Sequence, residues 1–218
     1  MTSRALMPLA ALALALTTSC TGMLPGSGEP SRLFTLTPKT TYGDDLPRAN
    51  WQLTIDAPIA EAGLNTTRIA LRHSPVTLEY YARAEWVDRA PLLVQTLLIE
   101  SFEATRKIVA VGRNSVNLRS DYNLLCELRE FQAEYDGNTS APSVHVRINA
   151  KLVKMPERVI VGSTTAEYVE RAKSGDLDVV VSTFDEMLGK SIKRVVEWTL
   201  RTGAEAEAPR RPANAPRS

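Results

Sequence analysis

Hydrophobic and polar residues alternate along two long segments in the second half of the chain, residues 122–135 and 144–153. A period of two, with one apolar and one polar face, is typical of strands in an antiparallel sheet. The first segment changes phase near Arg129 and Glu130, which predicts a β-bulge there. Residues 158–169 follow a turn and complete a predicted three-stranded meander.

The first half of the chain contains shorter runs with the same alternation. They predict five further strands, over residues 32–38, 51–57, 68–72, 76–81 and 107–113. His73, Ser74 and Pro75 separate two of these runs and form the predicted turn of a hairpin.

Two other segments carry apolar residues at three- and four-residue spacing, which is typical of amphipathic helices. The first is expected to begin after Asp88, as the N-cap, and to run to about Lys107. The second is expected to run from about Leu177 to Leu200, with Asp176 as its cap. Strands, helix, meander and helix in this order predict an α+β fold, with two main helices on one face of a mixed, mostly antiparallel sheet.

The first nineteen residues have the features of a secretory signal peptide. Arg4 precedes an apolar run of about a dozen residues, which is well short of the roughly 20 that span a bilayer. Thr17-Thr18-Ser19-Cys20 resembles the lipobox of bacterial lipoproteins, although Leu is more usual where Thr17 stands. We therefore expect removal of residues 1–19 and acylation of Cys20 with chains such as palmitate, because several chains are needed for a durable anchor. The alternative is an ordinary secreted protein in which Cys20 is incidental.

Composition divides the remainder of the chain into three parts. Residues 20–31 are rich in Gly, Pro and Ser, which predicts a flexible tether. Residues 203–218 hold no aliphatic side chain larger than Ala, so we expect a disordered tail. The folded α+β domain is therefore expected over residues 32–202, a length that suits a single domain.

Charge and cysteine content narrow the functional classes. The chain has 26 basic and 25 acidic residues and a net charge of +1, so a charge-driven nucleic-acid binder is not the default interpretation. Cys126 is the second of two cysteines, so acylation of Cys20 would leave it without a disulfide partner in the chain. Cys126 falls on the apolar side of its strand and is predicted to be a core thiol.

The sequence offers no recognisable catalytic, metal or cofactor motif. His145 falls on the polar side of its strand, so a Cys–His pair with Cys126 is not expected, and His73 lies in a turn. No CxxC, HExxH, GxGxxG or P-loop spacing occurs, so we expect no enzyme, cofactor or metal. Tyr80, Tyr81 and Trp86 are the candidate partner-binding residues, because aromatic side chains are enriched at interfaces. The alternative for Trp86, which we favour, is that it fills the joint between strand and helix.

Residues 71–102, LRHSPVTLEYYARAEWVDRAPLLVQTLLIESF, resemble the signature of the ABC-type transport auxiliary lipoprotein component family, which includes relatives of paraquat-inducible protein C. The opening RLFTLTP is similar to that of the family, with Phe34 where Tyr is commoner. LLCELREFQAEY resembles the family's strand ending in FE, with Gln132 replacing the acid.

The resemblance implies a non-catalytic accessory of a lipid transport system built from an ATPase, a permease and a substrate-binding protein with a mammalian-cell-entry domain. It would dock and align these components from the periplasmic side of the cell envelope, and direct phospholipid binding stays open. Thr21 rather than Asp follows Cys20, which favours the outer membrane. The alternatives are an outer-membrane assembly lipoprotein that chaperones or plugs a β-barrel, a periplasmic enzyme using Cys126, and a free lipid carrier.

Overall fold

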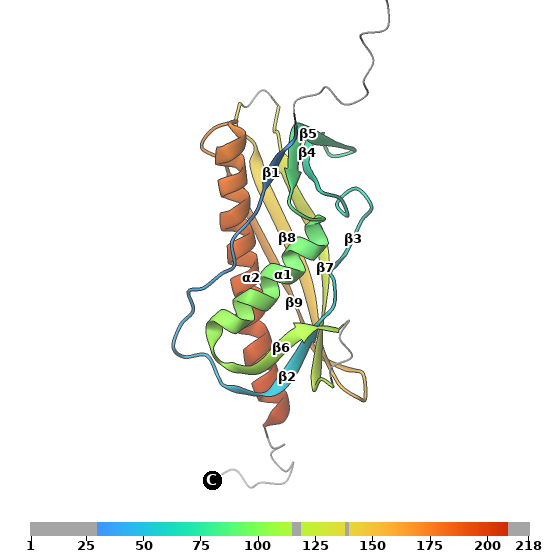
Figure 1. The fold of residues 1–218 in the computed structure, drawn as a ribbon, viewed down its shortest axis with the longest axis vertical. Coiled ribbons are helices and arrows are strands. Elements are labelled where there is room, and N and C mark those ends of the chain that lie inside the picture. Colours follow the sequence, from blue (N-terminus) through green and yellow to red (C-terminus); the bar gives the residue numbers. More distant parts are fainter. Residues whose placement is uncertain (1–29, 115–118, 138–139, 209–218) are drawn as a thin grey trace, which may run out of the picture. The chain divides into compact units, whose positions relative to one another are not determined.

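The computed structural model describes residues 30–114, 119–137 and 140–208, and these fold into a nine-stranded mixed sheet with two helices (Figure 1). The strands are β1 (Arg32–Phe34), β2 (Ala49–Ile55), β3 (Ile59–Ala60), β4 (Arg68–Ser74), β5 (Thr77–Trp86), β6 (Ile108–Arg113), β7 (Tyr122–Glu134), β8 (Ser143–Lys154) and β9 (Val159–Arg171). The helices are α1 (Ala90–Thr105) and α2 (Leu177–Glu207). The predicted α+β class is confirmed.

The long strands β7, β8 and β9 form the predicted antiparallel meander. The β7–β8 and β8–β9 ladders each join twelve residue pairs, whereas no parallel ladder joins more than five. The register of β7 shifts between Leu128 and Glu130, which confirms the predicted bulge. Alternation along one strand therefore located this irregularity correctly.

Strand β7 is the centre of the sheet because its second edge is shared by three shorter strands. That edge pairs in parallel with β2 at residues 122–124, with β3 at residues 127–128 and with β4 at residues 132–134. The outer positions on this side are taken by β6, which pairs with β2, and by β5 and β1 beyond β4. The short strands thus satisfy in turn the backbone groups that β7 presents along its length.

The two helices contact one another on one side of the sheet, and α2 lies along β8 and β9 (Figure 1). Trp86, Phe131 and Phe184 meet there, with ring centroids 5.1 to 5.5 Å apart. They come from β5, β7 and α2, so this cluster joins the hairpin, the meander and the long helix. The buried hydrophobic core extends from Leu36 to Leu200.

Helix α2 extends beyond its predicted end. The expected disorder from Gly203 is wrong for residues 203–207, which continue the helix. A Cβ at position 203 would collide with the indole of Trp51, so glycine permits close packing of the helix here. The Tyr122 hydroxyl also donates a 2.7 Å hydrogen bond to Glu207. The contacts with Trp51 and Tyr122 thus extend α2 beyond the end that hydrophobic periodicity predicts.

The two predicted helix caps have different outcomes. The Asp176 carboxylate accepts a hydrogen bond from the backbone N–H of Asp178, so it caps α2 as predicted. The prediction for Asp88 is wrong, because the N-cap of α1 is Arg89, which makes no side-chain capping bond. The first helical N–H, that of Ala90, instead donates to the Thr66 carbonyl at 3.1 Å. A backbone acceptor from a neighbouring loop therefore replaces the side-chain cap.

Candidate functional site

The structure buries one of the predicted partner-binding residues. Trp86 is 1% exposed and packs within the aromatic cluster at the joint between β5 and α1. Its burial supports the interpretation that it fills this joint. Cys20 lies outside the described residues.

Tyr80 and Tyr81 are both half-buried but have separate environments. The Tyr80 hydroxyl donates to the Gly63 carbonyl at 3.0 Å, and the Arg68 guanidinium lies 3.7 Å from the centre of its ring. The Tyr81 hydroxyl lies 3.1 Å from that of Tyr135, and burial together with this hydrogen bond raises the pKa of Tyr81. The two tyrosines therefore do not form one patch, and only Tyr81 is joined to the hollow described next.

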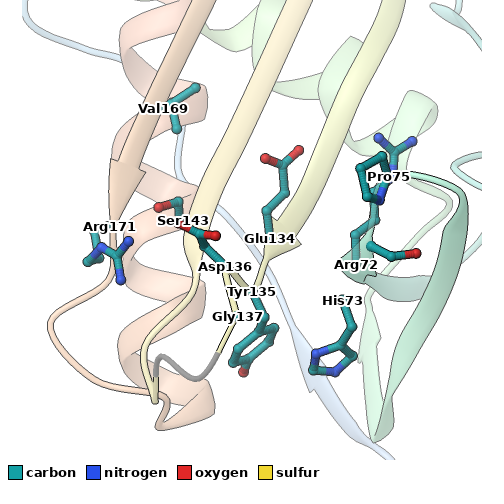
Figure 2. Close-up of a pocket in the computed structure, with 11 residues that line it drawn as sticks. Arg72, His73, Pro75, Glu134, Tyr135, Asp136, Gly137, Ser143, Val169 and Arg171 are labelled. Carbon is teal, nitrogen blue, oxygen red and sulfur yellow. The ribbon is translucent and has the colours of Figure 1, made fainter.

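A hollow of about 480 Å³ lies where β4, β7, β8 and β9 reach one end of the sheet (Figure 2). We call it the strand-end hollow. Its central residues form one cross-strand row, in which Arg72 pairs with Glu134, Glu134 with Ser143, and Ser143 with Arg171. Neighbouring strands lie about 4.8 Å apart, so the Cα atoms of the two arginines are separated by about 14 Å. Figure 2 shows the arginines on opposite sides of the hollow with Glu134 between them.

Contacts with the described residues leave several N–H donors of the Arg72 and Arg171 guanidinium groups unused. Arg171 donates one long bond, 3.5 Å, to the Ala141 carbonyl, and Arg72 donates one of 3.5 Å to Glu130. Each guanidinium has five N–H donors, so these contacts use a minority of them. The Glu134 carboxylate already accepts a 2.8 Å hydrogen bond from Gln132. The row therefore offers guanidinium donors on either side of a carboxylate, which suits a ligand that carries both acceptors and donors.

The rest of the hollow is suited to recognition rather than to covalent chemistry. The His73 ring stacks on Tyr135, with centroids 4.8 Å apart and an interplanar angle of 25°. The nearby Ser74 hydroxyl lies 2.8 Å from the hydroxyl of Thr77, not beside an imidazole. A serine nucleophile needs an adjacent base, and this contact does not supply one.

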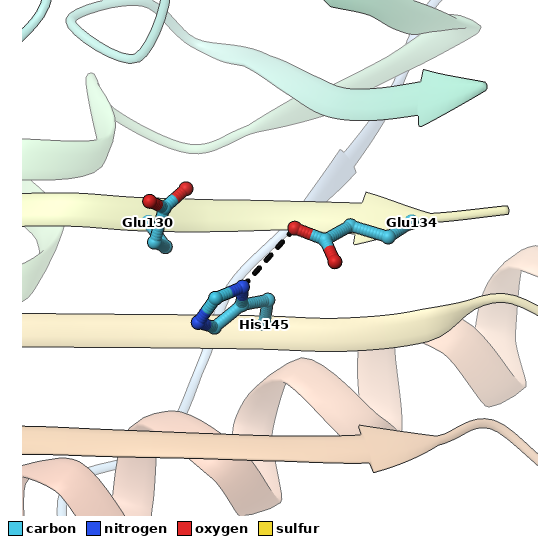
Figure 3. Close-up of side chains that lie close together, drawn as sticks. All are labelled: Glu130, Glu134 and His145. Atoms are coloured by element: carbon cyan, nitrogen blue, oxygen red, sulfur yellow. Dashed lines mark hydrogen bonds and ion pairs between the residues drawn. The ribbon is translucent and has the colours of Figure 1, made fainter. Parts of the chain in front are cut away.

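Glu130, Glu134 and His145 offer oxygen and nitrogen atoms within 4.8 Å of one another on the sheet face away from the helices (Figure 3). Glu130 accepts from Arg147 at 2.5 Å and also pairs with Arg72. These guanidiniums already supply the positive charge that a metal ion would bring. We therefore interpret the cluster as a polar network rather than a metal centre.

Cys126 lies on the opposite face of the sheet from His145, as predicted. The thiol belongs to a residue that is 3% exposed, and burial raises its pKa to about 12, with a smaller contribution from the Asp56 carboxylate. A thiol that stays protonated at neutral pH is a poor nucleophile. The prediction of a core thiol is confirmed.

None of the helices in the described ranges is long and apolar enough to cross a bilayer. The sequence matches the model of the ABC-type transport auxiliary lipoprotein component family over residues 34–196. It is 30% identical to the uncharacterized protein bll6063 of Bradyrhizobium diazoefficiens. The 180 aligned residues cover 81% of this chain and 47% of that protein. The chain thus spans about half the length of this curated relative.

Solved structures give the same picture of the fold. The crystal structure of protein XCC0632 from Xanthomonas campestris has a TM-score of 0.77 and 29% identity, covering 82% of this chain and 100% of that one. A second, of an uncharacterized protein, has a TM-score of 0.60 at 14% identity over 77% of this chain and 97% of that one, and shares the fold. Because the family model spans most of the described domain, the chain belongs to the ABC-type transport auxiliary lipoprotein components.

Proposed function

We propose that this protein is a membrane-anchored, periplasm-facing subunit of an ABC-type lipid transport system whose substrate-binding component carries a mammalian-cell-entry domain. Its role is to dock and align the transport components without catalysis. The observation that carries the proposal is the family match over residues 34–196, which covers nearly all of the folded domain.

The anchor in this proposal is an acylated Cys20. It lies twelve residues before Arg32, where β1 begins, and a chain of that length spans at most about 40 Å. The domain would therefore stay close to the bilayer that holds the acyl chains. Thr21 after the cysteine favours the outer membrane as that bilayer.

The partner contacts in this proposal lie on β5, where Tyr80 and Tyr81 offer two separate contact points rather than one patch. Both side chains are partly accessible, and tyrosine supplies contact area together with a hydrogen-bonding group. Trp86 would act only indirectly, by holding the end of β5 in position, since its side chain is buried. The chemistry of the strand-end hollow also fits a binding role better than a catalytic one.

Affinity capture from detergent-solubilised envelopes tests the proposal. We expect the tagged wild-type protein to recover a mammalian-cell-entry-domain protein together with a permease and an ATPase. Cys20→Ala should recover less, because the unacylated chain is no longer held beside its partners. Ser27→Ala, in the same segment, is the matched control and should behave as the wild type.

Two outcomes would contradict the proposal. Recovery of β-barrel assembly components alone would favour the alternative of an outer-membrane assembly lipoprotein. Mass spectrometry that finds the processed N-terminus at position 20 without acyl chains would remove the anchor on which the mechanism depends.

A further inference from the structure

Strand β9 is the longest outer strand of the sheet, and one of its edges has no neighbouring strand among the described residues. Its 13 residues pair with β8 along the other edge (Figure 3). The outer strands at the far side of the sheet, β1 and β6, are much shorter, with 3 and 6 residues. An open edge presents unpaired N–H and C=O groups, to which a further strand can add.

The sequence of β9 lacks the residues that usually protect an open edge. Natural edge strands are commonly blunted by Lys or Pro, and VIVGSTTAEYVER contains neither. Most of its residues are Val, Ile, Thr or Tyr, the types that favour strands. The ladder with β8 contains a bulge, which leaves Val161 out of step between Ile160 and Gly162. The edge is therefore long and well suited to further pairing.

Two exposed apolar side chains of β9 lie on the sheet face away from the helices. Ile160 is 56% exposed and Val169 is 54% exposed. Val169 pairs with His145, whose ring lies on that face. Gly162 lies against α2, and Ile160 is the next position of the ladder beyond the bulge, so Ile160 lies on the same face as Val169. The two side chains are therefore placed near opposite ends of one strand, on one face.

We propose that β9 pairs with β9 of a second copy of this chain, in antiparallel orientation about a two-fold axis at Thr165. Counting outward from the axis, Gly162 faces Tyr168 of the second copy, and the bulge then brings Ile160 opposite Val169. Directly opposed side chains in an antiparallel pair have Cβ atoms about 5 Å apart. The two-fold axis makes each contact twice, so all four exposed side chains are covered.

The order of side chains along β9 selects this register over its neighbours. An axis at Thr164 would place Ile160 opposite Glu167, and an axis at Ala166 would place it opposite Arg171. Both alternatives set an apolar side chain against a charge. In the proposed register β9 is complementary to itself, which identifies a second copy rather than a foreign strand as the occupant of the edge.

The glycine of β9 fits the same arrangement. A Cβ at Gly162 would lie 2.9 Å from Thr202 and 3.2 Å from Trp198, so the packing of α2 favours glycine here. Glycine leaves a gap in the surface of an edge strand, and an aromatic side chain on a neighbouring strand can cover it. Tyr168 of the second copy takes that position in the proposed register.

Disulfide trapping in intact envelopes tests the pairing and its register. Thr165→Cys sets one thiol of each copy opposite the other, with Cα atoms about 4.5–5.5 Å apart, which is within disulfide reach. Mild oxidation should therefore give a product of twice the mass of the chain. Val159→Cys is the matched control on the same strand, because its two thiols would lie about 35 Å apart. It should give no more dimer than the wild type, whose Cys126 is buried.

Two lysine substitutions at exposed positions of β9 sharpen the test. Thr165→Lys sets two ammonium groups opposite one another at the axis and should raise the dissociation constant of the dimer about fivefold. Ser163→Lys sets each ammonium group opposite Glu167 of the second copy and should leave the constant unchanged or lower it. Sedimentation equilibrium measures these constants on the processed chain, residues 20–218 with Cys20→Ser, which retains the whole hydrophobic core. Thermal unfolding checks that both variants keep the fold.

Three outcomes would overturn the proposal. The processed chain would sediment as a monomer even at millimolar concentration, or both lysine substitutions would weaken the dimer equally, which would exclude this register. The Thr165→Cys chain would instead form a cross-linked product of another mass, which would assign the edge to a foreign strand. The proposal does not depend on a transport role, because these assays detect copies of this chain, and its failure is therefore distinguishable from a failed capture of transport components.

Discussion

The two faces of the β7–β9 meander are built from the same strands but differ in burial and in charge. On the face toward the helices, the alternate residues of β7 are all 3% exposed or less: Tyr122, Leu124, Cys126, Leu128, Phe131 and Ala133. On the other face, β7 and β8 carry a ladder of ion pairs such as Glu127–Lys151 and Glu130–Arg147. The first face is covered by the helices, whereas the second carries charged side chains that stay partly exposed.

The comparison also separates two kinds of polar group. Glu127 keeps a third of its side chain exposed and contacts Arg129 and Lys151. Glu130 keeps only 14% exposed and lies between Arg72 and Arg147. Screening by water weakens the ion pairs of Glu127, while partial burial strengthens those of Glu130. Burial, rather than which face a residue occupies, should therefore decide its contribution to folding.

The largest effect is expected from Phe131→Ala on the helix-covered face. Phe131 packs against Trp86 and Phe184, and truncation leaves a cavity that three elements cannot readily close. We expect the free energy of unfolding in guanidinium to fall by about 3–5 kcal/mol. A loss below about 1 kcal/mol would mean that the aromatic cluster does not stabilise the packing of β5, β7 and α2.

A smaller loss, about 1–3 kcal/mol, is expected from Glu130→Gln on the open face. The substitution removes the charge that two half-buried guanidiniums share. Glu127→Gln is the matched control and should cost at most about 1 kcal/mol, because its ion pairs are more exposed. Urea denaturation of both variants measures the difference, and equal losses would refute the role of burial.

The buried Cys126 thiol should make the free energy of unfolding fall at alkaline pH. Its pKa is raised to about 12 in the folded protein from 9.0 in an unperturbed thiol, so the unfolded chain loses this proton first as pH rises. The contribution of the protonated Cys126 thiol to the free energy of unfolding is therefore complete below pH 9 and declines as the pH rises above 9. Between pH 7 and pH 10, the wild type should lose about 1.4 kcal/mol more than Cys126→Ala does.

Guanidinium unfolding of the two proteins at both pH values gives this difference directly. Tyr42, Tyr81 and Tyr122, whose pKa values are also raised by burial, are common to both chains and cancel in the comparison. The native thiol should also resist iodoacetamide until the chain unfolds. Rapid labelling of the native protein would show that the thiol is accessible.

The smallest effect is expected from Lys190→Ala on the exposed side of α2. Lys190 pairs with Glu170 at 3.1 Å and with Glu186 at 2.8 Å, and all three side chains are more than 40% exposed. We expect a loss below about 1 kcal/mol that disappears in 1 M salt, as measured by thermal unfolding. A salt-insensitive loss would indicate a packing role for the lysine stem.

The local pattern of the sequence was sufficient for many elements of the fold. Alternation located the meander, a phase change located its bulge, and Asp176 marked the start of α2. The burial of Cys126 followed from its position among apolar neighbours in β7. These features depend on residues close together in the chain, where periodicity and capping act directly.

Other features depended on which distant segments meet. The parallel pairing of β4 with β7 brings Arg72 into one row with Arg171, although 98 intervening residues separate them in the sequence. The Tyr81 hydroxyl meets that of Tyr135, 54 residues further along the chain, and packing on Trp51 continues α2 past Gly203. Alternation shows which face a residue occupies but not which strand lies beside it. The core and the meander could therefore be predicted from the sequence, whereas the strand-end hollow was decided by long-range pairing.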